Sequence, residues 1–184
     1  MPGVRSEGEL RAHLDEHGLL REGALEPPER TRRFLVFAQR PDARFELAVW
    51  TDHAARYFET QLQGTKKQYP FEPPRVDAAF VTVQPQGGRE EGRICFGRPR
   101  QDDDLLAGEE ADAAAGWTGL ALLAKRCASV WLVEAEGADD RASLLIAAIL
   151  ASVVLGPILA PGDRELFGVR TARLKLESVR GPYR

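Results

Sequence analysis

The chain has 184 residues and a formal net charge of −3, with 43% hydrophobic and 29% charged residues. This length and balance predict one globular domain over residues 1–184, and the slightly negative charge gives no reason to expect nucleic acid as a partner. The two cysteines, Cys95 and Cys127, are too few for a disulfide framework. Because no signal peptide opens the sequence either, we expect a cytoplasmic protein with free thiols.

The N-terminal part of the chain predicts a helix. Ser6 and Glu9 have the spacing of a capping box, leucines then recur at roughly helical spacing, and Gly18 and Gly23 offer stops. A short apolar run at 34–38 predicts the first strand. We therefore expect the fold to begin with a helix that is followed by a sheet.

Further strand signals come before residue 84. Apolar and polar residues alternate over 44–50, and 76–83 is another run of strand length. Residues 54–63 fit either a helix or a strand, because their start favours a helix while Phe58, Thr60 and Leu62 alternate with other residues. Propensity alone does not decide this segment.

The middle of the chain is predicted to be less regular. Residues 84–116 form a long irregular segment with an acidic run at 101–112. This acidic run is most simply a solvated loop, and alternatively it positions an incoming amine or contacts a basic partner. Residues 117–134 then predict a helix. The side chains that this helix is expected to bury are Leu120, Leu123, Val130 and Leu132.

The C-terminal part contains a long uncharged stretch. Residues 142–161 reach the length of a membrane span. Gly156 and Pro157 interrupt the stretch, and neither aromatic nor basic anchors flank it, so a helix buried in the domain or in a partner interface is the better interpretation. Alternation of apolar and polar residues over 171–177 predicts a final strand.

Two motifs in register carry the main functional signal. Tyr69-Pro70-Phe71-Glu72-Pro73-Pro74 is a proline-fixed turn that neither a helix nor a central strand could contain. Gly92-Arg93-Ile94-Cys95 then places a thiol, a strong nucleophile at neutral pH, after a strand-length stretch. Arg93 and Arg98 could favour its thiolate. Taken alone, Cys95 is more simply a buried structural cysteine that packs like a small hydrophobe.

Together these motifs resemble the ubiquitin-conjugating (E2) family, whose core reads YPF.PP, then a strand, then a loop ending G.IC. The resemblance covers about residues 31–134 and leaves 135–184 as a divergent C-terminal extension. It implies an α+β fold of the UBC/RWD kind, with an N-terminal helix, a four-stranded antiparallel meander, the YPFEPP turn, a cysteine loop and C-terminal helices, here with an extra C-terminal strand. The family's order of elements favours a strand at 56–62. The turn residues to which it gives an architectural role are Tyr69, Pro70, Phe71, Pro73 and Pro74.

The resemblance also implies an acyl-transfer activity. Cys95 would accept a ubiquitin-like protein as a thioester from an E1-like activating enzyme and pass it to a target nucleophile. The family's HPN asparagine is missing, and its nearest equivalent is Gln84-Pro85-Gln86, in which the Gln86 amide would help to stabilise the oxyanion. No metal or cofactor is implied. The arginine bias suggests a bacterial member, and bacterial relatives occur beside E1-like and JAB-type peptidase genes, often in antiphage defence.

Two alternatives stay open. The first is a catalytically inactive E2-variant or RWD-like adaptor that binds a protein partner. A buried Cys95 thiol would favour this adaptor, and a thiol that solvent can reach would favour the enzyme. The second alternative is an unrelated α/β protein, such as a toxin-immunity or membrane-associated factor.

The remaining chemistry-bearing residues have simpler interpretations. His13 and His17 have the i, i+4 spacing that can start a zinc site, but no third ligand is apparent. His53 lies in an expected turn, and nothing in the sequence places it beside Cys95. Cys127 lies among apolar residues and is expected to pack in the core.

Overall fold

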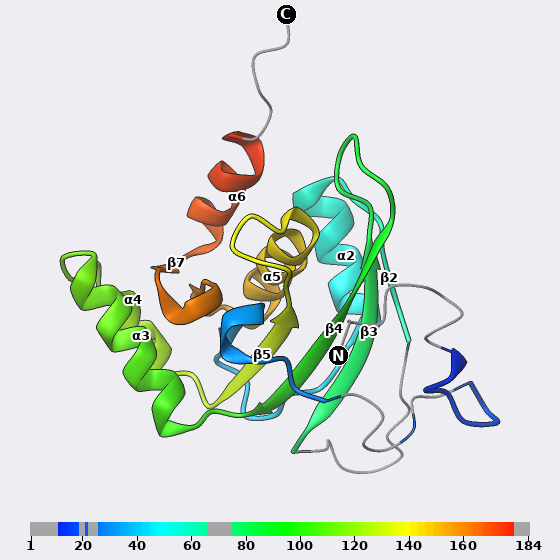
Figure 1. Cartoon of the computed structure of the whole chain (residues 1–184), viewed down its shortest axis with the longest axis horizontal. Coiled ribbons are helices and arrows are strands. Elements are labelled where there is room, and N and C mark those ends of the chain that lie inside the picture. The colour runs from blue at the N-terminus through cyan, green and yellow to red at the C-terminus, as the bar shows by residue number, and fades with distance from the viewer. Residues whose placement is uncertain (1–10, 19–20, 22–25, 66–74, 179–184) are drawn as a thin grey trace, which may run out of the picture.

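The centre of the protein is a seven-stranded sheet in the order β2-β3-β4-β5-β1-β6-β7, in which every neighbouring pair of strands is antiparallel (Figure 1). The computed structural model describes residues 11–18, 21, 26–65 and 75–178. The strands are β1 (Arg33–Ala38), β2 (Leu62–Gly64), β3 (Asp77–Val83), β4 (Glu91–Pro99), β5 (Ser129–Glu134), β6 (Ile158–Leu159) and β7 (Leu166–Phe167).

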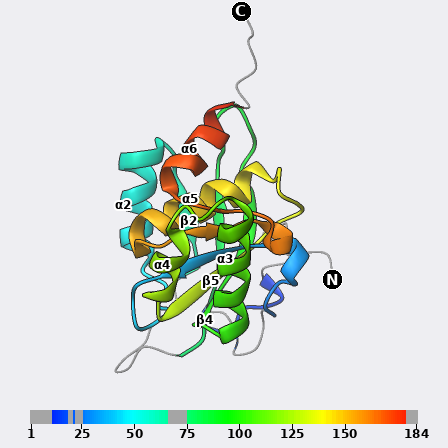
Figure 2. The same ribbon diagram turned by 90° about the vertical axis from the view of Figure 1, so that its left-hand side faces the viewer.

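Helices cover both faces of this sheet, which makes the fold a mixed α+β fold. One face packs against α2, α5 and α6, and the other packs against α3 and α4. Figure 2 looks onto the second side, where α3 and α4 lie in front of the sheet. The helices are α2 (Leu47–Phe58), α3 (Asp102–Ala114), α4 (Leu120–Lys125), α5 (Arg141–Val154) and α6 (Val169–Ser178), with short 3-10 turns η1 (Arg30–Arg32) and η2 (Pro161–Asp163).

The central strands are uninterrupted apolar runs because both of their faces are covered. β1 pairs with β5 along its whole length. Successive side chains of a strand point to opposite faces, so Phe34 and Val36 join the core under α2 and α5, whereas Leu35 and Phe37 join the core under α3 and α4. Two hydrophobic cores therefore share one sheet.

Helix α5 is the buried helix predicted within 142–161. Asp140 caps its start by accepting a hydrogen bond from the backbone N–H of Ser143 (3.1 Å), and Leu155 ends it in the left-handed conformation. Nearly every residue of α5 is buried in this domain. No helix in the described part of the chain combines the length and the apolar character needed to cross a membrane.

The predicted strand at 44–50 and the favoured strand at 56–62 are wrong, because α2 occupies residues 47–50 of the first segment and 56–58 of the second. The buried residues of α2 are Trp50 and Ala54, and Phe58 packs against the same core. These residues are four apart, which is the spacing of one helix face. The expected four-stranded meander is therefore built from other segments: β2, β3, β4 and β5 follow one another in the sheet, and β1 lies between β5 and β6.

Three predictions for the second half are also wrong. The irregular segment at 84–116 contains β4 and α3, the helix at 117–134 is divided into α4 and β5, and the final strand is the helix α6. In α6 the buried Ala172 and the partly buried Leu176 lie four residues apart on one face. The alternation over 171–177 is thus a by-product of an amphipathic helix.

The remaining predictions concern two strands and two segments that lie wholly or partly outside the described residues. The strands expected at 34–38 and 76–83 are β1 and β3. The YPFEPP turn at 69–74 lies outside the described residues, and so does the start of the predicted N-terminal helix. The helix prediction is wrong where this part of the chain is described, because residues 12–18 form turns, a bend and one bridge residue.

Candidate functional site

Cys95 lies in the middle of β4 and not in a loop. It is paired with Ala79 on one side and with Val133 on the other, and 0% of its surface is exposed. Burial, and secondarily the negative charge of Glu134, raises the pKa of the Cys95 thiol well above its usual range. This environment disfavours the thiolate, and it gives the sulfur no access to the terminus of another protein.

The thiolate-favouring roles expected of Arg93 and Arg98 are not what the structure shows. Arg93 donates hydrogen bonds to Asp140 and to the Ser143 hydroxyl, and Arg98 forms a two-armed ion pair with Asp104. Both guanidinium groups are therefore engaged with other partners. The charge that acts on Cys95 is the carboxylate of Glu134, which has the opposite effect.

Gln86 lies in the loop between β3 and β4, away from Cys95. Cys95 is paired with Ala79, whereas the hairpin closes at the pair of Val83 and Glu91. Four residues of strand separate the two positions, or about 13 Å at the usual rise per residue. The structure does not bring the Gln86 amide to the thiol.

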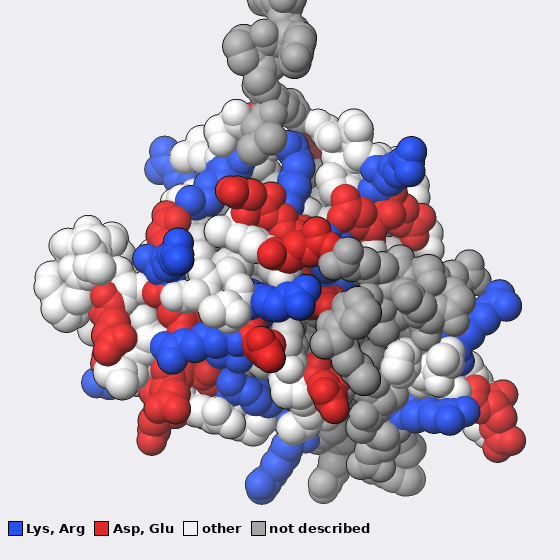
Figure 3. Space-filling view, viewed as in Figure 1, with Lys and Arg blue, Asp and Glu red and all other residues white. Residues whose placement is uncertain are grey.

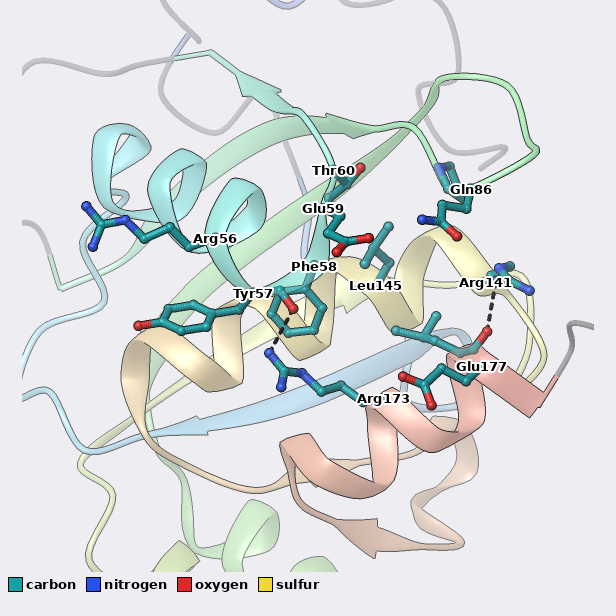
Figure 4. Close-up of a pocket in the computed structure, with 12 residues that line it drawn as sticks. Arg56, Tyr57, Phe58, Glu59, Thr60, Gln86, Arg141, Leu145, Arg173 and Glu177 are labelled. Atoms are coloured by element: carbon teal, nitrogen blue, oxygen red, sulfur yellow. Dashed lines mark hydrogen bonds between the residues drawn. The ribbon is translucent and has the colours of Figure 1, made fainter.

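A groove of about 390 Å³ lies instead between α2, the β3–β4 loop, α5 and α6, and Gln86 is on its wall (Figure 4). This volume is within the range of ligand-binding sites. The residues that line it are Arg56, Tyr57, Phe58, Glu59, Thr60, Pro85, Gln86, Arg141, Leu145, Arg173, Leu176 and Glu177.

Two arginines of the groove are held in place by backbone carbonyls. Arg173 donates from Nη2 to the carbonyl oxygen of Tyr57 at 2.8 Å and stacks over the Phe58 ring at 4.9 Å, and Arg141 donates from Nη2 to the carbonyl of Leu176 at 2.8 Å (Figure 4). These contacts tie the end of α2 and the start of α5 to α6. They also fix two guanidinium groups without neutralising them.

The charges around these arginines are only partly matched. No ion pair within the described residues joins Arg141 or Arg173 to a carboxylate, whereas Arg56 is paired with Asp52 at 2.8 Å. Arg173 Nε is buried without a hydrogen-bond partner. The groove therefore offers cationic donors to a ligand carboxylate, and the exposed residues Glu59 and Glu177 offer acceptors to N–H groups.

Sequence reasoning found one residue of this groove, Gln86, and for another reason. Arg141 and Arg173 stand in elements far apart along the chain, and no spacing pattern connects them to α2. Glu59 ends α2 in the left-handed conformation (φ 51°) and turns the chain sharply at the groove, but a glutamate does not signal such a turn in the sequence.

The other candidates have structural surroundings. His53 shares a hydrogen bond with Ser152 (Nδ1 to Oγ, 3.0 Å) and does not lie in a turn but in α2. Cys127 is buried as expected, and burial raises the pKa of its thiol to about 11 although Arg100 opposes the shift. His13 and His17 lie in turn structure, and no group of three metal-binding side chains occurs among the described residues.

The acidic run at 101–112 is not a loop but most of α3, and two of its carboxylates are buried. Asp104 binds Arg98, and Asp112 accepts hydrogen bonds from the turn after α3. Figure 3 shows acidic and basic side chains interspersed over the face that it presents, without one continuous field of either sign. Comparisons of the chain with protein-family models, with curated proteins and with solved structures found no match.

Proposed function

We propose that the protein is a non-catalytic binding domain that holds a carboxylate-bearing segment of a protein partner in the groove between α2 and α6. The observation that carries the proposal is the pair of guanidinium groups of Arg141 and Arg173. Each is fixed by a backbone carbonyl and joined to no carboxylate within the described residues. A fixed guanidinium loses little conformational entropy on binding an anionic group.

The rest of the groove suits a short peptide segment. Phe58, Leu145 and Leu176 supply apolar surface, and the side chains of Glu59 and Glu177 can accept hydrogen bonds from peptide N–H groups. Interface residues that dominate binding energy are commonly aromatic or arginine, and Tyr57 with Arg173 provide both types here.

The buried thiol favours the inactive adaptor over the thioester carrier. An E2-like transfer would require Cys95 to leave the centre of a paired strand, and none of the geometry around Cys95 supports that use. A binding role needs no such movement. The two free cysteines of the protein suit the reducing cytoplasm in which we place this domain.

The test is selection of short peptides from a random display library on the immobilised full-length protein. We expect enriched sequences to carry an Asp, a Glu or a C-terminal carboxylate. Arg141→Gln and Arg173→Gln should each weaken the selected peptides at least tenfold, which corresponds to about 1.4 kcal/mol. Arg170→Gln, an exposed arginine of the same helix α6 that does not line the groove, is the matched control.

Two outcomes would overturn the proposal. One is peptide binding that responds equally to Arg170→Gln and Arg173→Gln while all variants keep the melting temperature of the parent. The other is a reductant-sensitive mass adduct on Cys95 after incubation with an E1-like enzyme and a ubiquitin-like protein, with Cys127→Ala retaining the adduct and Cys95→Ala losing it.

A further inference from the structure

A second, smaller cavity lies on the opposite side of the sheet from the groove. It measures about 160 Å³ and is enclosed by the start of β1, the start of α3 and η2. Its apolar floor is formed by Leu35, Ala107 and Leu159, which belong to the core under α3 and α4. Its polar wall contains three arginines, Arg30, Arg33 and Arg98.

Only two of these three arginines have carboxylate partners in the described structure. Arg98 donates to both oxygens of Asp104, at 2.6 and 2.9 Å, and Arg30 is paired with Asp163. No hydrogen bond or ion pair within the described residues uses the guanidinium of Arg33, and its Nε is buried without a partner. Among the three arginines of the wall, Arg33 is thus the one whose guanidinium has no carboxylate partner in the described structure.

The electrostatic surroundings of Arg33 are unfavourable to its own charge. Burial lowers the pKa of Arg33, Asp104 partly opposes this effect, and the positive charges of Arg98 and Arg30 add to it. A partly desolvated cation that lacks an anionic partner costs stability. An anion in the cavity would remove that cost.

We propose that this cavity binds a single small oxyanion, a phosphate or a carboxylate group, with Arg33 as its principal ligand. Because Nε is shielded from solvent, the anion would meet the terminal nitrogens of the guanidinium group. The first turn of α3 lines the same cavity, but its N-terminus is closed by a capping box between Gln101 and Asp104, so Arg33 supplies the main attraction for an anion. The side chain of Asp103, also on the wall, opposes an anion and sets a limit on affinity.

The test measures the melting temperature of the full-length protein in a buffer of bulky, weakly binding ions, with added sodium phosphate or sodium acetate. At an anion concentration about ten times its dissociation constant, we expect the preferred anion to raise the melting temperature by about 3–6 °C. Arg33→Met should abolish this rise and, without anion, melt at or above the parent temperature, since it removes an unmatched charge. Asp103→Asn should strengthen binding several-fold, and Arg89→Gln, an exposed arginine of the β3–β4 loop, should leave it unchanged.

Each result decides between binding and a structural role for Arg33. A rise with phosphate alone assigns a phosphoryl group, and a rise with acetate alone assigns a carboxylate. An equal rise in the parent and in Arg33→Met, or no rise with either anion, overturns the proposal, as does an Arg33→Met variant that melts well below the parent in the absence of anion. Since peptide binding in the groove uses other residues, failure here leaves the proposed function untouched.

Discussion

Arg93 and Asp140 are the buried ion pair that joins β4 to the start of α5. Their side chains are 9% and 5% exposed, and Arg93 Nη2 lies 2.9 Å from Asp140 Oδ1. Burial alone would raise the pKa of Asp140, but hydrogen bonds from Arg93 and from the backbone of Glu136 and Ser143 outweigh it and lower that pKa. The carboxylate therefore has two structural roles, as counter-ion and as the N-cap of α5.

We predict that Asp140→Asn lowers the free energy of unfolding by about 2 kcal/mol or more, because it removes the buried counter-ion of Arg93 and leaves only the half-exposed carboxylate of Glu91, 2.7 Å from Arg93 Nη2. Urea unfolding at pH 7 measures this difference. The neighbouring exposed Asp139→Asn should change stability by less than about 0.5 kcal/mol. Equal effects of the two substitutions would contradict the role given to the pair.

The pH dependence of this effect has a definite sign. Because the folded-state pKa of Asp140 lies below its unfolded value of about 3.9, its contribution is complete above that value and is lost as the pH falls through the folded-state pKa. The stability gap between the parent and Asp140→Asn should therefore be constant near neutrality and shrink in acid below about pH 4. A gap that grows in acid would exclude this explanation.

Among the elements, the turn between α3 and α4 is organised by one carboxylate. Asp112 accepts hydrogen bonds from the N–H groups of Thr118, Gly119 and Ala121 and from the Thr118 hydroxyl. Burial opposes ionisation of Asp112, but these donors outweigh it and lower its pKa. The turn holds Trp117 in the left-handed conformation (φ 63°) with 71% of its surface exposed.

We predict opposite effects for two substitutions in this turn. Asp112→Ala should destabilise the protein by about 2 kcal/mol or more, since it leaves several donors without an acceptor. Trp117→Gly should be neutral or stabilising by up to about 1 kcal/mol, because glycine adopts a positive φ without strain. Thermal and urea unfolding measure both, and the exposed Glu110→Ala of α3 serves as the control. A Trp117→Gly variant that is strongly destabilised would show that the indole supports the fold.

The elements also show which sequence signals were sufficient. The apolar runs at 34–38 and within 142–161 predict β1 and α5 correctly. Both runs are buried on every side, so an uninterrupted apolar sequence is what each of them requires. Alternation over 44–50 failed, because it is too short to separate a period of 2 from one of 3.6 and the deciding residues, Trp50 and Ala54, lie at and beyond its end. The groove was not predictable from pattern, since Arg141 and Arg173 meet α2 only through tertiary packing.

The expected position of Cys95 in a loop is wrong for a related reason, since Cys95 lies in β4. A thiol at the end of an apolar run fits both a reactive loop and a central strand, and only the pairing of β4 with β5 decides between them. That pairing joins segments separated by α3 and α4, so it is a property of the whole sheet. The burial of Cys95 in this paired strand is the observation that favours the proposed binding role over thioester transfer.

At the scale of the whole molecule, the segment between α5 and β6 packs directly against β1, the strand that both cores share. Gly156 lies at this crossing, and a Cβ built on it would lie 1.8 Å from the carbonyl oxygen of Phe37 in the central strand β1. The backbone N–H of Phe37 donates to the carbonyl of Pro157 at 3.0 Å. The two backbone segments therefore cannot move apart without breaking this hydrogen bond. Only a residue without a side chain fits there.

We therefore predict that Gly156→Ala costs more than about 3 kcal/mol of unfolding free energy, since the clash is with backbone and not with a flexible side chain. Gly137→Ala, where no atom lies within 4 Å of the added carbon, should be close to neutral. Urea unfolding followed by tryptophan fluorescence suits the measurement, because Trp50 and Trp131 are buried in the core on the α5 side of β1. Parallel losses in both variants would point to a general cost of replacing glycine, whereas a loss confined to Gly156→Ala would identify the crossing of α5 over β1 as a contact on which both cores depend.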